Sequence, residues 1–230
     1  MILERFVCGR TRTNAYLMAG DGASGCYVVD PGSGASPKIW SAAQDLGLVV
    51  EAVLLTHGHP DHVWSARDLS DRCSAPVLLH ALDAVWLDDC ASGGLLRGVT
   101  HGGRLVSRLR RLRPARLEAV EPGDIEVAGC RVRVIHTPGH TPGGVCYDAG
   151  EVCFTGDSLF AGGLGHTGYP GGDGAVLRRS VVESLLPSLD GSVRILPGHG
   201  PQTTVADARR RLGTAQAQPA ASGEGSAWTS

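Results

Sequence analysis

The sequence predicts an α+β fold in which two β-sheets pack face to face and helices cover both outer sides, a four-layer αββα sandwich. Two observations predict it. Strand patterns precede helix patterns in the first half of the chain, and the same order returns in the second half. The alternative, one doubly wound sheet, requires a stricter alternation of strand and helix than residues 1–30 and 124–155 show. The 230 residues are also enough for one substantial core.

The first half begins with short apolar stretches separated by Gly, Asn and Asp, which indicate a meander of strands. Ser36, Pro37 and Gly47 mark a helix, with Ser36 as its cap, proline at its first position and glycine as its stop. In chain order we expect strands over 2–8, 14–19 and 25–30, a helix over 36–47, a strand over 50–56, a helix over 62–72, a strand over 76–80 and a helix over 82–90.

The second half repeats this style and completes the fold. Here we expect strands near 125–128, 130–136, 144–148 and 151–155, a helix over 175–189, a strand over 193–196 and a short helix over 203–212. We expect one domain over residues 1–212 and a disordered tail over residues 213–230, where small and polar residues dominate.

Residues 91–116 form an arginine-rich insertion, with seven arginines and no acidic residue. Its leucines and arginines fall on neighbouring helical stripes: Leu105, Leu109 and Leu112 on one, and Arg104, Arg108 and Arg111 on the other. One interpretation is a solvated cap that docks through its leucines. The other is a lid whose three arginines contact an anionic substrate.

Composition and charge give no sign of a nucleic-acid-binding, membrane or secreted protein. The net charge of −2 requires no nucleic-acid or membrane partner. No apolar run approaches the roughly 18 residues of a membrane span, and the N-terminal residues lack the apolar core of a signal peptide. The seven cysteines form no C-x-x-C pair and mostly lie in apolar surroundings, which is typical of buried free thiols in a reducing compartment. We therefore expect a cytoplasmic protein.

The stretch VLLTHGHPDHVW, residues 53–64, places four ligand-type side chains at the end of an apolar strand. His57 and His59 are two positions apart and point to the same side of an extended segment, whereas Asp61 and His62 follow Pro60 and project from a turn. Two pairs that are aimed differently favour two metal ions over one. Further ligand-type residues follow other strands in glycine-rich loops: His140, Asp157 and His199.

The remaining histidines are interpreted differently. His80, His101 and His166 have the spacing of ordinary hydrogen-bonding surface residues. His136 shares a loop with His140 but belongs to the preceding strand, so we expect it to support the site without binding metal.

The motifs THGHPDH, TPGHTPGG, GDSLF and PGHG, in this order, resemble the metallo-β-lactamase superfamily. The resemblance covers roughly residues 10–205 and implies the metallo-β-lactamase fold, the αββα sandwich expected above. It implies two divalent metal ions, for which Zn²⁺ fits the donors best and Fe or Mn is an alternative. It also implies the ligands: His57, His59 and His140 on one ion, Asp61, His62 and His199 on the other, and Asp157 bridging both. In VVDPG, Asp30 resembles a residue that supports the ligands.

The segment GDSLFAGGLGHTGYPGGD resembles the hydroxyacylglutathione hydrolase (glyoxalase II) branch and its short bacterial relatives. True β-lactamases of the superfamily typically lack a bridging aspartate at this point. The chain departs from the branch at His166, Thr167 and Gly168, where Arg-Thr-Asp is usual, which makes His166 a candidate substrate contact. It also lacks the extra C-terminal helices, and its only lysine is Lys38.

The resemblance therefore implies an enzyme that hydrolyses a small-molecule substrate, with acyl thioesters, including anionic ones, as the first candidates. A metal-bound hydroxide would attack without a covalent acyl-enzyme, and Asp61 and Asp157 would be the catalytic carboxylates. Rival functions are a mononuclear iron persulfide dioxygenase, a lactonase, a nuclease and a non-catalytic metal-binding module. The overall acidic balance argues against nucleic acid, and the sequence gives no oligomeric state.

Overall fold

Two six-stranded sheets form the centre of the molecule in the computed structural model, which describes residues 1–92 and 112–213. In the first sheet the strands lie in chain order. The first three strands are antiparallel neighbours and the later ones are parallel. The strands are β1 (Ile2–Cys8), β2 (Thr13–Ala19), β3 (Gly25–Val29), β4 (Val49–Leu54), β5 (Val77–Leu79) and β6 (Leu117–Ala119).

The second sheet has the order β14-β13-β10-β9-β8-β7, and only β10 and β13 pair in parallel. Its strands are β7 (Gly123–Val127), β8 (Cys130–His136), β9 (Val145–Asp148), β10 (Val152–Gly156), β13 (Arg194–Pro197) and β14 (Thr203–Thr204). A small separate hairpin joins β11 (Leu159–Phe160) to β12 (Gly163–Leu164).

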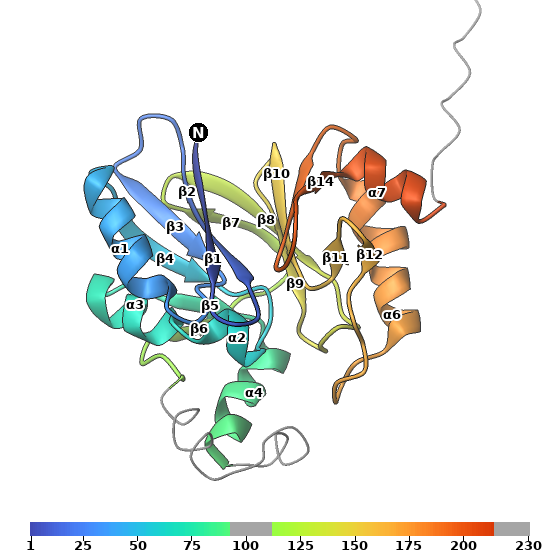
Figure 1. Cartoon of the computed structure of the whole chain (residues 1–230), viewed down its shortest axis with the longest axis horizontal. Coiled ribbons are helices and arrows are strands. Elements are labelled where there is room, and N and C mark those ends of the chain that lie inside the picture. Colours follow the sequence, from blue (N-terminus) through green and yellow to red (C-terminus); the bar gives the residue numbers. More distant parts are fainter. Residues whose placement is uncertain (93–111, 214–230) are drawn as a thin grey trace, which may run out of the picture.

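Helices cover the outer side of each sheet (Figure 1). On the first sheet lie α1 (Ala35–Asp45) and α3 (Ala66–Cys73), with α2 (Pro60–Val63) and α4 (Ala81–Ser92) near its lower edge in this view. On the second lie α6 (Gly174–Arg179), which continues through a π-helical turn (Ser180–Leu185) and a 3₁₀ turn (Leu186–Ser188), and α7 (Val205–Arg211). This arrangement confirms the predicted αββα sandwich and shows that the single doubly wound sheet is wrong. None of the helices in the described ranges is long and apolar enough to cross a membrane.

Alternate residues of β2 enter different cores, because successive side chains of a strand point to opposite faces. Leu17 packs in the core between the first sheet and its helices, whereas Tyr16 and Met18 pack between the two sheets. The inter-sheet core also holds Tyr27 and Phe154, both fully buried, with the Phe154 ring 5.3 Å from the Tyr16 ring. All of β2 is therefore buried.

Tyrosine hydroxyls connect the ends of the two sheets. The Tyr147 hydroxyl of β9 donates to the Leu55 carbonyl just beyond β4, at 2.9 Å. The Tyr16 hydroxyl of β2 donates to the Pro197 carbonyl at the end of β13, at 2.7 Å. These bonds satisfy polar groups that would otherwise be buried without a partner, and they hold the loop after β4 against β9 and the end of β13 against β2.

The helix predicted over 62–72 is wrong as a single element. It is divided into α2 and α3 at Trp64 and Ser65. The Ser65 backbone N–H donates to the Pro31 carbonyl and its hydroxyl donates to the Gly32 carbonyl, so Ser65 is bound to the β3–α1 loop. The break lets α2 present Asp61 and His62 independently of α3.

Two other helix predictions need correction. The first helix starts at Ala35 after Gly34, which adopts φ 77°, and the buried Ser36 lies inside the helix and not at its cap. The helix predicted over 175–189 changes hydrogen-bonding pattern after Arg179, where the Ser180 hydroxyl donates to Pro138 O and Val176 O. Pro187, which lacks an N–H, lies in the closing 3₁₀ turn.

The short strands β6, β11, β12 and β14 were not predicted, because two or three residues give too little pattern. Leu112, the last of the three predicted leucines, is buried in the core beneath α1 and α3. The rest of that stripe, with Arg104, Arg108, Arg111 and His101, lies outside the described residues, as does the tail from residue 214 onward.

Candidate metal centre

The loop that follows β4 delivers the first two histidines. Backbone bonds from Asp30 N to Leu54 O and from Leu55 N to Leu78 O keep the strand paired up to the start of this loop. Gly58 lies between His57 and His59, and a Cβ there would come within 2.8 Å of the Asp83 carbonyl oxygen. Glycine therefore lets α4 approach the loop closely, and both imidazoles are free to turn inward.

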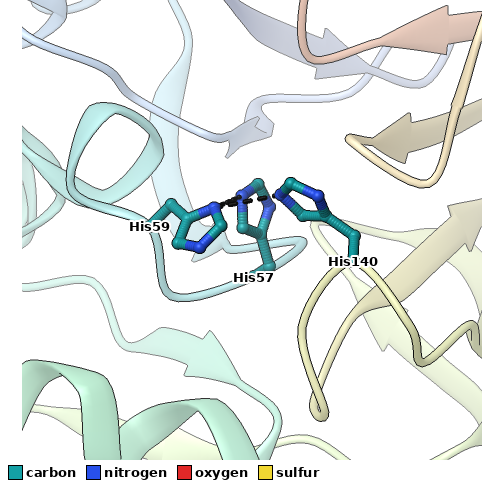
Figure 2. A group of neighbouring side chains, drawn as sticks. All are labelled: His57, His59 and His140. Carbon is teal, nitrogen blue, oxygen red and sulfur yellow. Dashed lines mark hydrogen bonds between the residues drawn. The ribbon is translucent and has the colours of Figure 1, made fainter. Parts of the chain in front are cut away.

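Three imidazoles converge at this point, as Figure 2 shows for His57, His59 and His140. His59 Nδ1 lies 3.1 Å from His57 Nε2 and 3.0 Å from His140 Nε2. His140 comes from the β8–β9 loop of the other sheet, so the set joins both halves of the fold. The three ligand atoms lie within 4.8 Å of one another. We call these residues the first ligand set.

Hydrogen bonds fix the tautomers of His57 and His140 in the first set. His57 Nδ1 lies 3.0 Å from Thr56 Oγ1, whose own hydrogen is donated to Asp30 Oδ2 at 2.6 Å. Nδ1 of His57 is therefore the protonated nitrogen, and its Nε2 carries a lone pair. His140 Nδ1 donates to the His166 carbonyl at 2.5 Å, which likewise leaves the lone pair on Nε2. Both lone pairs converge on His59 Nδ1, and a cation held between the three nitrogens would contact all of them.

A second ligand set consists of Asp61, His62 and His199. His199 Nε2 lies 3.3 Å from Asp61 Oδ2 and 3.3 Å from His62 Nε2. The outer nitrogens are again occupied: His62 Nδ1 donates to Asp30 Oδ2 at 2.9 Å, and His199 Nδ1 donates to Thr11 O at 3.1 Å. As for His57 and His140, the Nε2 atoms of both rings are directed to the centre.

Asp157, just beyond β10, lies between the two sets. Its Oδ2 is 3.6 Å from His140 Nε2 and 3.6 Å from His199 Nε2, one nitrogen from each set. Its Oδ1 is buried and lies 3.4 Å from His62 Nε2. Glycine at position 198 makes room for it, because a Cβ there would lie 2.4 Å from Asp157 Oδ1. The carboxylate is thus placed to contact cations at both sets.

The protonation states differ between the two sets. Burial, reinforced by neighbouring imidazoles, lowers the pKa of His57 well below its ordinary value and that of His59 to about 4, so both rings are neutral at neutral pH. Burial also lowers the pKa of His62, but the charges of Asp157 and Asp30 outweigh it and raise the pKa well above 6.5. Without a metal ion, the second set therefore carries a proton that a cation would displace.

Asp30 supports both sets from below. Its Oδ1 accepts from the Thr56 backbone N–H at 2.8 Å, and its Oδ2 accepts from the Thr56 hydroxyl and from His62 Nδ1. The residue adopts φ 48°, a conformation that aspartate tolerates better than most residues and that turns the carboxylate under the loop. Asp30, His57 and His62 also lie close enough to form a third candidate ligand group. Because both Asp30 oxygens already accept hydrogen bonds, we interpret that group as support.

His136 and His166 lie at the edge of the centre. His136 Nε2 donates to the Pro142 carbonyl at 3.0 Å, within the loop that carries His140. The His166 carbonyl accepts from His140, and the His166 ring lies 5.4 Å from the Tyr169 ring. His80, expected at the surface, is instead buried and stacks on His136 with centroids 4.6 Å apart.

Sequence reasoning missed three residues beside the first set. The His59 ring lies 5.5 Å from the Trp86 ring and 5.2 Å from the Tyr169 ring, and Tyr169 is 45% exposed. Asp83, on the same helix as Trp86, is fully buried and bonds to the loops of His57 and His140. The spacing of Asp83 and Trp86 on one helical face was a usable signal, but nothing local connected it to the metal motifs.

The sequence profile of the metallo-beta-lactamase superfamily matches residues 8–199, and His199 is the last residue matched. The chain belongs to the metallo-β-lactamase superfamily. All seven candidate ligands fall inside the matched range. The donor atoms of this superfamily member fit two metal sites. They are five imidazole nitrogens and the carboxylates of Asp61 and Asp157.

Two proteins of similar sequence align with most of this chain. An uncharacterized protein of Mycobacterium tuberculosis is 36% identical over 218 residues, which cover 91% of this chain and 96% of that protein. The hydroxyacylglutathione hydrolase GloC of Haemophilus influenzae is 31% identical over 194 residues, which cover 83% of this chain and 87% of GloC.

Two solved structures are similar over nearly their whole length. BLEG-1, a B3 metallo-beta-lactamase, matches with a TM-score of 0.78 and 30% identity, covering 91% of this chain and 97% of its own. TTHA1623, in a di-iron-bound form, matches with a TM-score of 0.73 and 32% identity, covering 91% and 98%. The similar structures therefore include a protein that binds two irons in this fold.

Proposed function

We propose that this chain is a binuclear metal-dependent hydrolase that cleaves an acyl thioester. The observation that carries the proposal is the pair of ligand sets with Asp157 Oδ2 at 3.6 Å from a nitrogen of each. The similarity to hydroxyacylglutathione hydrolase GloC supports a thioester as the substrate class. The ligand geometry supports the metal centre, and the relative supports the substrate class by analogy.

Zinc is the metal we propose, since imidazole and carboxylate donors without thiolate suit Zn²⁺, and iron is the first alternative in view of the di-iron form of TTHA1623. His57, His59 and His140 would hold one ion, Asp61, His62 and His199 the other, and Asp157 both. When bound, such ions supply a hydroxide nucleophile near neutral pH and polarise a carbonyl oxygen.

The chain's own residues then hold and move protons. Burial raises the pKa of Asp61, but hydrogen bonding to His199 and the charge of His62 outweigh this and hold the pKa below its ordinary range. The carboxylate is therefore ionised at neutral pH. Asp61 Oδ2 accepts from the Thr13 hydroxyl at 3.0 Å, which fixes the carboxylate. We assign Asp61 to accept the proton released when water attacks the substrate.

The leaving group argues for a thioester over an amide. His57, His62, His140 and His199 use their outer nitrogens in hydrogen bonds, and His136 donates to Pro142 O. The His59 Nε2 atom is buried without a partner among the described residues, but burial lowers the pKa of His59 to about 4, so that ring carries no imidazolium proton at neutral pH. None of these imidazoles is free to protonate a departing amine. A thiolate needs no such acid, because the pKa of a thiol is about 8.5.

Arginines beside the second set favour an anionic substrate. Arg10 and Arg12 flank Thr11, whose carbonyl accepts from His199 Nδ1. Both arginines are exposed, and neither makes a hydrogen bond or ion pair with a described residue. We propose that both arginines contact an anionic thiol carrier. His166, Arg104, Arg108 and Arg111 would contact the substrate as well.

A substrate screen with metal analysis tests the proposed function. The wild-type protein loaded with Zn²⁺ is expected to turn over an acyl thioester of an acidic thiol far faster than a lactone, a β-lactam, an RNA or a persulfide. Preferred hydrolysis of a β-lactam would favour an activity like that in the name of BLEG-1. One iron per chain with oxygen uptake on a persulfide would favour a dioxygenase; either result would refute thioester hydrolysis.

The proposal also places the enzyme in the cytoplasm. The six cysteines whose side chains are described are all free, and Cys8, Cys26, Cys146 and Cys153 are buried. Free buried thiols are typical of proteins from a reducing compartment.

A further inference from the structure

Asp83 lies near the centre, takes no part in the reaction itself and accepts three hydrogen bonds. It lies in the first turn of α4 and is fully buried. Its Oδ2 accepts from the Gly58 backbone N–H at 2.8 Å and from the Thr141 hydroxyl at 2.7 Å. Its Oδ1 accepts from the Gly143 backbone N–H at 2.6 Å. All three donors come from loops outside α4.

These donors belong to the two loops that carry the first ligand set. Gly58 lies between His57 and His59, and Thr141 follows His140 directly. The loops belong to different halves of the fold, one after β4 in the first sheet and the other between β8 and β9 in the second. One carboxylate therefore bonds to both loops and sets their separation where the three imidazoles meet.

Glycines at two loop positions allow the close approach between these loops and Asp83. A Cβ at Gly58 would lie 2.8 Å from the Asp83 carbonyl oxygen, and a Cβ at Gly143 would lie 2.6 Å from Asp83 Oδ1. Glycine at both positions lets each loop amide reach α4. The second ligand set is held differently, through Asp30 and the Thr11 carbonyl.

We propose that Asp83 is a positioning residue that sets the metal affinity of His57, His59 and His140 without contacting the metal. The proposal rests on the two-metal centre of the proposed function. It predicts a selective effect: loss of the Asp83 bonds weakens the first set and leaves the second unchanged. A carboxylate that merely stabilised the fold would affect both sets or neither.

The test is Asp83→Asn, which keeps the shape but replaces one acceptor oxygen by an NH₂ group. With three N–H or O–H donors around the carboxylate, at least one must then face another donor. Each set is isolated by removing a ligand of the other: His199→Ala leaves the first set, and His57→Ala leaves the second. The dissociation constant of Zn²⁺ is measured in each background by competition with a chelator on the apo-protein.

We expect Asp83→Asn to weaken Zn²⁺ binding about 10–100-fold in the His199→Ala background, the range typical when a residue that supports a ligand is lost. Binding in the His57→Ala background should stay within about twofold. Asp30→Asn is a comparison variant that should weaken the second set, since Asp30 bonds directly to His62 and reaches His57 only through Thr56. Asp68→Asn, an exposed carboxylate paired with Arg72 on α3, should change neither.

Unchanged affinity of the first set, or equal losses in both sets, would overturn the positioning role. If Asp83→Asn fails to fold, Thr141→Val removes one donor to Asp83 at nearly constant shape. It should still weaken the first set, and an unchanged dissociation constant would again overturn the role. A wild-type protein that binds fewer than two ions would instead refute the two-metal proposal itself.

Discussion

Replacing Asp30 with asparagine removes one negative charge from beneath the centre without changing the backbone. Asparagine tolerates the left-handed conformation that Asp30 adopts at φ 48°, so the substitution tests the carboxylate alone. The carboxylate accepts three hydrogen bonds, two from Thr56 and one from His62. An asparagine can accept with only one of its two terminal atoms.

The better orientation of the amide keeps its oxygen toward the Thr56 hydroxyl and His62. The NH₂ group then faces the buried Thr56 backbone N–H, and leaving that donor unpaired costs about 1–3 kcal/mol. The two remaining bonds lose their charge assistance, which is about 1 kcal/mol for each. The free energy of unfolding of the apo-protein should therefore fall by about 3–5 kcal/mol, and Tm by about 6–20 °C at about 2–4 °C per kcal/mol for a chain of this size.

Calorimetry of the metal-free protein and chelator competition measure the two consequences. The second ligand set should bind Zn²⁺ about 10–100-fold more weakly, because His62 loses its charged partner. A Tm within about 2 °C of wild type, with unchanged affinity of the second set, would refute the assignment of Asp30 as a support for His62. Asp68→Asn serves as the control, since that exposed carboxylate interacts with Arg72 on α3.

Asp157→Ala should weaken metal binding at both ligand sets together, because one carboxylate lies 3.6 Å from a nitrogen of each; two ions retained after dialysis would refute the bridge. Lowering the pH from about 7 to about 5 should release the ion of the second set first, because the raised pKa of His62 makes it take up a proton while His59, with a pKa of about 4, stays neutral. Metal content after dialysis at each pH measures this, and the reverse order would contradict it. Replacing Arg10 and Arg12 together with alanine should raise KM severalfold for an anionic thioester and leave KM for a neutral one unchanged; equal effects on both would remove the arginines from substrate binding.

The αββα layers could be predicted because burial leaves a strong pattern in the longer elements. In β2, residues that alternate between two cores are all apolar or hydrogen-bonded, whereas in β8 the buried Val132 and Val134 alternate with more exposed arginines. The break between α2 and α3 could not be predicted, since its cause is the pair of bonds from Ser65 to Pro31 and Gly32, more than thirty residues earlier. Tertiary bonds of this kind override local helix preference.

The candidate ligands could be chosen from the sequence because each follows a strand and sits among glycines. His57 and His59 needed only the two-residue spacing, whereas assigning His140 to the same set depended on the family resemblance. Asp83 was missed because its three donors come from two loops that are distant in sequence. His80 was misjudged as a surface residue, because its burial depends on stacking with His136 from the other sheet.

Metal content and thioester turnover, measured on the same preparation of the full chain during stepwise addition of Zn²⁺ to the apo-protein, test the central claim most directly. The account predicts two ions bound per chain, with hydrolysis of an acyl thioester rising as the sets fill and no acylated serine or cysteine detectable by mass spectrometry during turnover. Full activity with one ion per chain, or two bound ions with no thioester hydrolysis, would contradict it.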